Sequence, residues 1–139
     1  MKRMAVVSIG LAVLTALPAR ADDLTGVNRF LCSAGTLGAC CDSGECATGT
    51  PEELNIPQFI EVDLAAKRLS ATKASGLNRT TTLDYVKRVD GHIVLQGFEN
   101  GRAFSILIDE KTGEMSSAVS VVGCGITVFG ACTPLSSAK

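Results

Sequence analysis

Residues 90–113 read DGHIVLQGFENGRAFSILIDEKTG, and two apolar segments in this stretch are separated by the dipeptide Asn100-Gly101. A similar dipeptide, Asp90-Gly91, precedes the first segment. Asn-Gly and Asp-Gly favour type I′ turns, because both central residues of such a turn need a positive φ angle. After the second dipeptide, apolar residues occupy every other position from 104 to 108. The stretch therefore predicts antiparallel strands joined by tight turns.

The same kind of pattern extends on both sides of this stretch. We expect strands over residues 59–64, 67–73, 80–89, 92–99, 102–109, 114–122 and 126–132. In the strand 80–89, Leu83, Tyr85 and Val89 are expected to share one face. The predicted fold class is all-β, an antiparallel meander sheet or small barrel with one face buried. Residues 58–133 form this β domain, and residues 134–139 form a C-terminal tail.

Residues 22–57 have a different composition, because they are rich in Cys, Gly, Ser and Thr. Apolar residues at positions 24, 27, 30 and 31 favour a short helix over residues 23–31. The stretch 32–50 has no clear periodicity, so we expect irregular structure that disulfides hold in place. The sequence thus predicts a Cys-rich N-terminal lobe bound to the β domain.

Residues 1–21 have the three regions of a secretory signal peptide. Lys2 and Arg3 precede an apolar run over residues 4–17, and Ala19-Arg20-Ala21 has the small-x-small form of a cleavage site. The apolar run is shorter than the ~20 residues that span a bilayer. We therefore expect a periplasmic or secreted protein that begins at Asp22 and has no membrane span.

The charge of the chain excludes some classes of partner. The protein holds 13 Lys and Arg and 14 Asp and Glu, and three of the basic residues lie within 1–21. The remainder therefore has a net charge of 10 − 14 = −4. Nucleic acids and anionic membranes are bound by clustered Lys and Arg, and no such cluster follows residue 21. The composition favours an envelope protein or a small ligand as partner.

All six cysteines lie beyond residue 21, and an even number in an exported chain indicates disulfides. They are Cys32, Cys40, Cys41, Cys46, Cys124 and Cys132. On one extended strand, the last two would have Cα atoms about 26 Å apart, whereas a disulfide needs about 7 Å or less. We therefore expect each of them to bond a cysteine within 32–46, with one further bond inside that segment.

Patterns that would indicate catalysis or metal binding are sparse. His92 is the single histidine, and no nucleophile motif accompanies it. The cysteines lack the spacing of zinc sites and of redox pairs, so we expect no metal or cofactor, with a metal or redox carrier as an alternative. Glu61 and Asp63 share one face of a predicted strand, which suits a solvated face or, alternatively, a hydrolytic carboxylate pair. We expect no catalytic residue.

Residues 93–105, IVLQGFENGRAFS, with Ile108-Asp109, Thr112-Gly113 and the later FGACT at 129–133, resemble a group of uncharacterised small exported proteins of alphaproteobacterial type. The resemblance covers residues 59–133 and implies a fold rather than an activity. The compact signal segment is similar to those of Gram-negative exported proteins, which implies the periplasm.

A second resemblance is to membrane-bound lysozyme inhibitors of the C type, which are small, disulfide-bearing antiparallel barrels with a Ser-Gly-x-x-Tyr inhibitory loop. The stretch 75–79 keeps Ser75 and Gly76, but Arg79 stands in place of the tyrosine, and this chain has four extra cysteines. The resemblance implies a binding loop at Ser75, Gly76 and Arg79. We expect a non-catalytic exported envelope protein that binds a protein or small ligand, with lysozyme inhibitor, small hydrolase and metal or redox carrier as alternatives.

Overall fold

The structure is a computed structural model that describes residues 22–76 and 78–135. The predicted signal peptide lies outside the described residues, as does most of the predicted tail. The predicted all-β antiparallel fold is confirmed, because the described chain consists of strands and two short 3₁₀ helices. Neither of these helices is long and apolar enough to cross a membrane.

All ten strands of the described chain belong to one antiparallel sheet. The order of nine of them is β5-β4-β3-β1-β10-β9-β8-β7-β6, and β2 pairs with β1. The elements are β1 (Arg29–Cys41), β2 (Cys46–Gly49), η1 (Pro51–Leu54), β3 (Phe59–Asp63), β4 (Arg68–Ala71), η2 (Lys73–Ser75), β5 (Thr80–Thr82), β6 (Tyr85–Val89), β7 (His92–Glu99), β8 (Arg102–Asp109), β9 (Glu114–Val121) and β10 (Cys124–Pro134).

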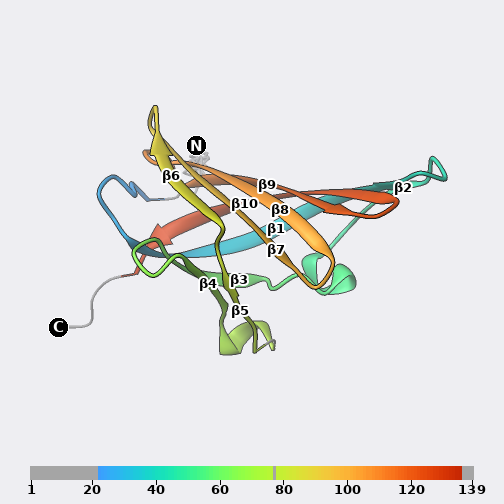
Figure 1. The fold of residues 1–139 in the computed structure, drawn as a ribbon, viewed down its shortest axis with the longest axis horizontal. Helices are drawn as coiled ribbons and strands as arrows, with labels where there is room; N and C mark the ends of the chain where they lie inside the picture. The colour runs from blue at the N-terminus through green and yellow to red at the C-terminus, as the bar shows by residue number, and fades with distance from the viewer. Residues whose placement is uncertain (1–21, 77, 136–139) are drawn as a thin grey trace, which may run out of the picture.

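The sheet curls, and the chain itself joins its two edges (Figure 1). β5 at one edge leads into β6 at the other edge through Leu83 and Asp84 alone. The Leu83 amide donates to the Lys67 carbonyl at 2.8 Å, and the Asp84 amide donates to the Gln96 carbonyl of β7 at 2.9 Å. The two residues thus connect backbone groups from both halves of the curled sheet.

This crossing corrects the prediction of one strand over residues 80–89. Leu83 is buried, whereas Tyr85 and Val89 are exposed, so the three side chains do not share a face. The side chain of Val86 packs against the core instead. The reason is that the chain leaves the ladder of β4 and enters that of β7 between Leu83 and Tyr85, which changes the residues that face inward.

The two predicted hairpin turns are confirmed. The φ angles are 49° and 76° at Asp90-Gly91, and 51° and 77° at Asn100-Gly101. Each pair connects strands in direct register, because β7 pairs with β6 on one side and with β8 on the other. The turn chemistry therefore sets the register of the meander.

Two predictions about the N-terminal segment are wrong, the helix over residues 23–31 and the irregular structure from residue 32 onward. A strand, β1, occupies residues Arg29–Cys41 in the middle of the sheet instead. β1 pairs with β10 on one side and with β3 and β2 on the other. Its buried residues Phe30, Cys32 and Ala34 recur at every second position, as a strand requires. The apolar spacing of a helix was thus overridden by backbone pairing on both sides.

The predicted pattern of disulfides is confirmed. Cys32 is bonded to Cys132 and Cys41 to Cys124, so both C-terminal cysteines reach the N-terminal segment. The third bond joins Cys40 to Cys46. Cys124 and Cys132 lie on the same extended strand, which agrees with the distance argument. The two long-range bonds link β1 to its neighbour β10 near both ends of their shared ladder.

Buried apolar side chains form two clusters inside the curled sheet. The larger cluster includes Leu24, Phe30, Ile93, Leu95 and Ile108, all almost completely buried. The smaller cluster is built on β1 and β10, and its buried members are Ala34, Leu37, Ile126 and Val128. It lies toward the end of β1 that pairs with β2, since Leu37 is paired with Gly49 of β2.

Candidate functional site

A cavity of about 110 Å³ lies inside the curled sheet, and with its open mouth the hollow measures about 840 Å³. Its walls come from both core clusters: Ile60, Leu69 and Ile106 belong to the larger one, and Ala34 and Val128 to the smaller one. The cavity thus lies where the two clusters fail to pack against each other. The walls are apolar apart from a few residues near the mouth and two hydroxyl side chains.

Small side chains on the inner face explain why this space is open. Ala34 of β1, Ala71 of β4, Thr81 of β5 and Ser117 of β9 all line the cavity. Larger side chains at these alternating positions would fill it. Ser117 is the one buried polar residue among the described residues, at 9% exposure, and with Thr81 it is one of two hydroxyl side chains in the lining.

The mouth of the cavity carries two arginines and one acid. Arg79 precedes β5, Arg102 begins β8, and Glu99 ends β7. Arg79 Nε lies 4.0 Å from Glu99 Oε1, which is too far for a hydrogen bond. Within the described chain, this buried Nε atom has no hydrogen-bond partner. A buried donor on a charged group is unfavourable when it has no hydrogen-bond partner. An added acceptor near Arg79 would therefore be stabilised.

Both arginines also hold the segment that borders the mouth. Arg79 Nη2 donates to the Asn55 carbonyl at 3.1 Å, and Arg102 Nη1 donates to the Leu54 carbonyl at 2.9 Å. The next two residues, Ile56 and Pro57, line the cavity. The end of η1 and the chain that follows it are therefore fixed to the rim by guanidinium groups from two different strands' ends.

The three residues of the predicted binding loop have different surroundings in the structure. Ser75 Oγ donates to the Phe59 carbonyl at 2.9 Å and accepts from the Phe59 amide at 2.8 Å, so its side chain ties η2 to β3. Gly76 ends η2 with a φ angle of 66° and is exposed. Arg79 lines the cavity. Sequence reasoning therefore selected one residue of the cavity mouth, for a different reason, and missed the cavity.

The acid pair on β3 is part of a surface ion cluster. Arg29 forms an ion pair with Glu61 and lies 3.7 Å from Asp63 Oδ2. The hydrogen bond to Glu61 raises the pKa of Arg29. The two carboxylates thus face an exposed arginine on the surface, which suits the solvated face expected from the sequence.

His92 lies at the opposite end of β7 from the mouth, beside a hydrogen-bonded turn. Its Nδ1 atom is 2.9 Å from the Asp90 carbonyl, and its Nε2 atom is 4.0 Å from Asp109 Oδ2. Asp109 Oδ1 accepts from the amides of Lys111 and Thr112, each at 2.9 Å. The backbone hydrogen bond from Thr112 lowers the pKa of Asp109.

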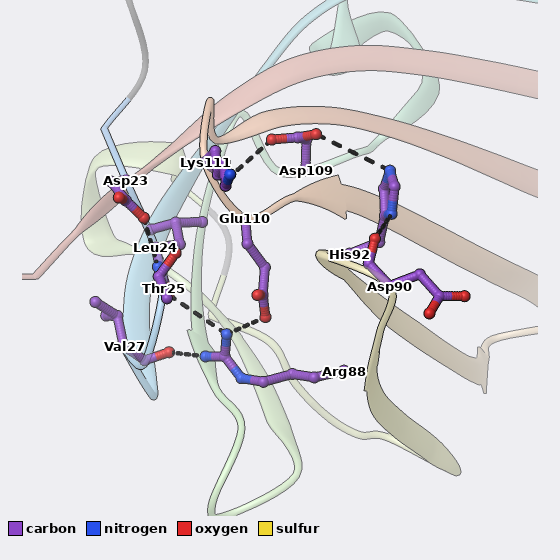
Figure 2. A network of polar contacts seen from close by, with 10 residues as sticks. All are labelled: Asp23, Leu24, Thr25, Val27, Arg88, Asp90, His92, Asp109, Glu110 and Lys111. Carbon is purple, nitrogen blue, oxygen red and sulfur yellow. Dashed lines mark hydrogen bonds and ion pairs between the residues drawn. The ribbon is translucent and has the colours of Figure 1, made fainter.

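The N-terminal segment is fixed near this same end of the curled sheet (Figure 2). Leu24 is completely buried, and its amide donates to the Glu110 carbonyl at 2.6 Å. Arg88 pairs with Glu110 and donates to the carbonyls of Leu24, at 3.4 Å, and Val27. The network is charge-balanced and hydrogen-bonded, so this part of the molecule is packed while the end near Arg79 is hollow.

A search of family models, curated proteins and solved structures finds no match to this chain.

Proposed function

We propose that the protein is an exported, non-catalytic binding protein that holds the apolar part of a small ligand in the cavity of the curled sheet. The apolar cavity between the two core clusters carries the proposal. Its volume, about 110 Å³, approaches the ~150 Å³ cavity that admits benzene. It suits a short aliphatic chain or a single ring.

The energetics of packing support an occupant. Protein interiors are close-packed, whereas alanine, serine and threonine side chains on this inner face leave a space of about 110 Å³ with mostly apolar walls. A ligand with an apolar tail that enters this space buries its own apolar surface there.

Export is supported by the signal pattern in residues 1–21 and by the three disulfides. Disulfides persist in the periplasm and outside the cell. Since all six cysteines are bonded, the oxidised protein offers no cysteine thiolate to a metal. The lysozyme-inhibitor interpretation stays a prediction, and the hydrogen bonds of Ser75 and Arg79 lie within the protein itself.

Binding of n-octanol, measured by titration calorimetry, tests the proposed function. Gly97 lies opposite Phe104, and a Cβ atom at residue 97 would be 2.6 Å from Phe104 Cζ. Gly97→Ala should therefore push the ring into the cavity that it lines and weaken octanol binding about tenfold or more. Gly38→Ala is the matched control, because a Cβ atom there meets nothing within 4 Å.

The wild-type protein and Gly38→Ala should bind octanol alike. Absence of saturable binding up to the solubility limit of octanol would contradict the proposal. Equal binding by Gly97→Ala and the wild type would place the alcohol elsewhere on the molecule.

A further inference from the structure

The donors at the cavity mouth are more numerous than their acceptors in the described chain. A guanidinium group has five N–H donors. Arg79 uses one on the Asn55 carbonyl and Arg102 uses one on the Leu54 carbonyl. Arg79 Nε is buried and unpaired among the described residues. The mouth can therefore bind an acceptor without releasing the segment at residues 54–57.

The charges at the mouth favour an anion with a single charge. Arg79 and Arg102 contribute two positive charges, and Glu99, 4.0 Å from Arg79 Nε, contributes one negative charge. The lining of the cavity holds no further ionisable side chain. One positive charge thus remains uncompensated beside an apolar space, where electrostatic attraction is stronger than in water.

We infer that the ligand of the cavity is a monocarboxylate with a short apolar tail, whose carboxylate is bound by Arg79 and Arg102. The inference rests on the proposed function, since the tail occupies the same cavity. Carboxylate and guanidinium form charge-assisted hydrogen bonds, and each of the two arginines has Nη–H donors beyond the one that it gives to the segment at residues 54–57. An uncharged ligand would leave the positive charge at the mouth without a counter-ion.

Paired titrations with n-octanoate and n-octanol test the inference, because the two probes share a tail and differ in charge. Wild-type protein should bind octanoate about tenfold or more tightly than octanol. Arg79→Gln and Arg102→Gln should each bring the ratio of octanoate to octanol affinity close to one, and this ratio corrects for any change that loss of the bonds to Asn55 and Leu54 makes to the cavity itself. Arg68→Gln is the matched control, because Arg68 is an exposed arginine of β4 outside the cavity.

A second measurement needs no substitution. The Nε–Hε resonance of Arg79, followed by NMR in the wild-type protein, should shift on addition of octanoate and not on addition of octanol. This readout decides the matter if Arg79→Gln fails to fold.

The outcomes separate the two proposals. If octanol binds as tightly as octanoate, the carboxylate site is wrong and the binding function stands. If Arg68→Gln weakens octanoate as much as Arg79→Gln does, the preference is only a general attraction to positive charge, and the inference is wrong. If neither probe binds, the binding function is wrong and the inference fails with it.

Discussion

Gly101 shows how a single residue determines a turn in this protein. Its φ angle is 77°, and a Cβ atom built on it meets nothing within 4 Å. A side chain at residue 101 would therefore be unfavourable only because of the strained backbone conformation. Gly101→Ala should therefore lower the free energy of unfolding by about 1–2 kcal/mol. Gly125→Ala is the control, since Gly125 also has open space but lacks a positive φ.

Urea unfolding of both variants measures the difference. Gly125→Ala should be neutral or slightly stabilising, because alanine restricts the unfolded chain. Equal stabilities would show that the turn at residues 100–101 adopts a different conformation in solution.

Asp109 makes a residue-scale prediction about pH. Hydrogen bonding, above all from the Thr112 backbone amide, lowers its pKa below the ordinary value of 3.8. A carboxylate with a lowered pKa stabilises the folded state at pH values above 3.8, and this contribution disappears as the pH falls through the lowered value. Asp109→Asn does not titrate, so the variant should lose less stability than the wild type on acidification.

Urea unfolding at about pH 6 and about pH 2.5 measures the two losses. Asp84→Asn replaces an exposed acid on the crossing between β5 and β6, and it should lose stability as the wild type does. If Asp109→Asn loses as much stability as the wild type, the turn does not hold the carboxylate.

At the scale of elements, the segment before β1, residues 22–28, covers one part of the core. Leu24 is completely buried and is held by backbone bonding to Glu110 and by Arg88. Leu24→Ala should lower the free energy of unfolding by about 2–5 kcal/mol, because it leaves a cavity. Val122→Ala, at a fully exposed turn, should change it by less than about 0.5 kcal/mol. Equal effects in urea unfolding would mean that residues 22–28 are not docked.

An element can be predicted from the sequence when local residues determine it, and not when it depends on pairing with distant strands. β7 and β8 are predictable to the residue, because both turns and the alternation are local. β1 is not, because its inward period depends on Cys32 and Ala34, which are easily read as loop residues, and on pairing with β10, the last strand of the chain. The break between β5 and β6 is equally hidden, since only the curl of the whole sheet requires it.

The candidate site illustrates the same limit. The cavity is made by small residues such as Ala34, Ala71 and Ser117, which belong to three strands far apart in the sequence. A small residue that lines a cavity looks the same in the sequence as a small residue in a well-packed core, so no local pattern distinguishes them. Arg79 was singled out only through the resemblance of its loop, and Arg102 was not singled out at all.

At the scale of the whole molecule, the disulfides differ in the length of chain that they close. Cys32–Cys132 joins residues 100 apart, whereas Cys40–Cys46 joins residues 6 apart. Because the Cys41–Cys124 bond remains, the path between Cys32 and Cys132 in the unfolded chain is only 9 + 8 = 17 residues long. In the chain-entropy model, replacing both cysteines of the first bond with alanine should therefore lower stability by about 3 kcal/mol, and replacing those of the second by about 2 kcal/mol. Urea unfolding of the two double variants measures this order, and a reversed order would contradict the prediction.

The adjacency of β1 and β10 has a consequence for how the protein is made. These neighbours are the first and last strands of the described chain, and two of the three disulfides join them. The ribosome delivers four cysteines, at residues 32, 40, 41 and 46, long before Cys124 and Cys132 exist. An oxidant that reacts with the growing chain can therefore form non-native disulfides among these four cysteines. Correct oxidation needs either protection of the early thiols until Cys124 and Cys132 are present, or later thiol–disulfide exchange, which is slow without an isomerase in the compartment where the protein matures.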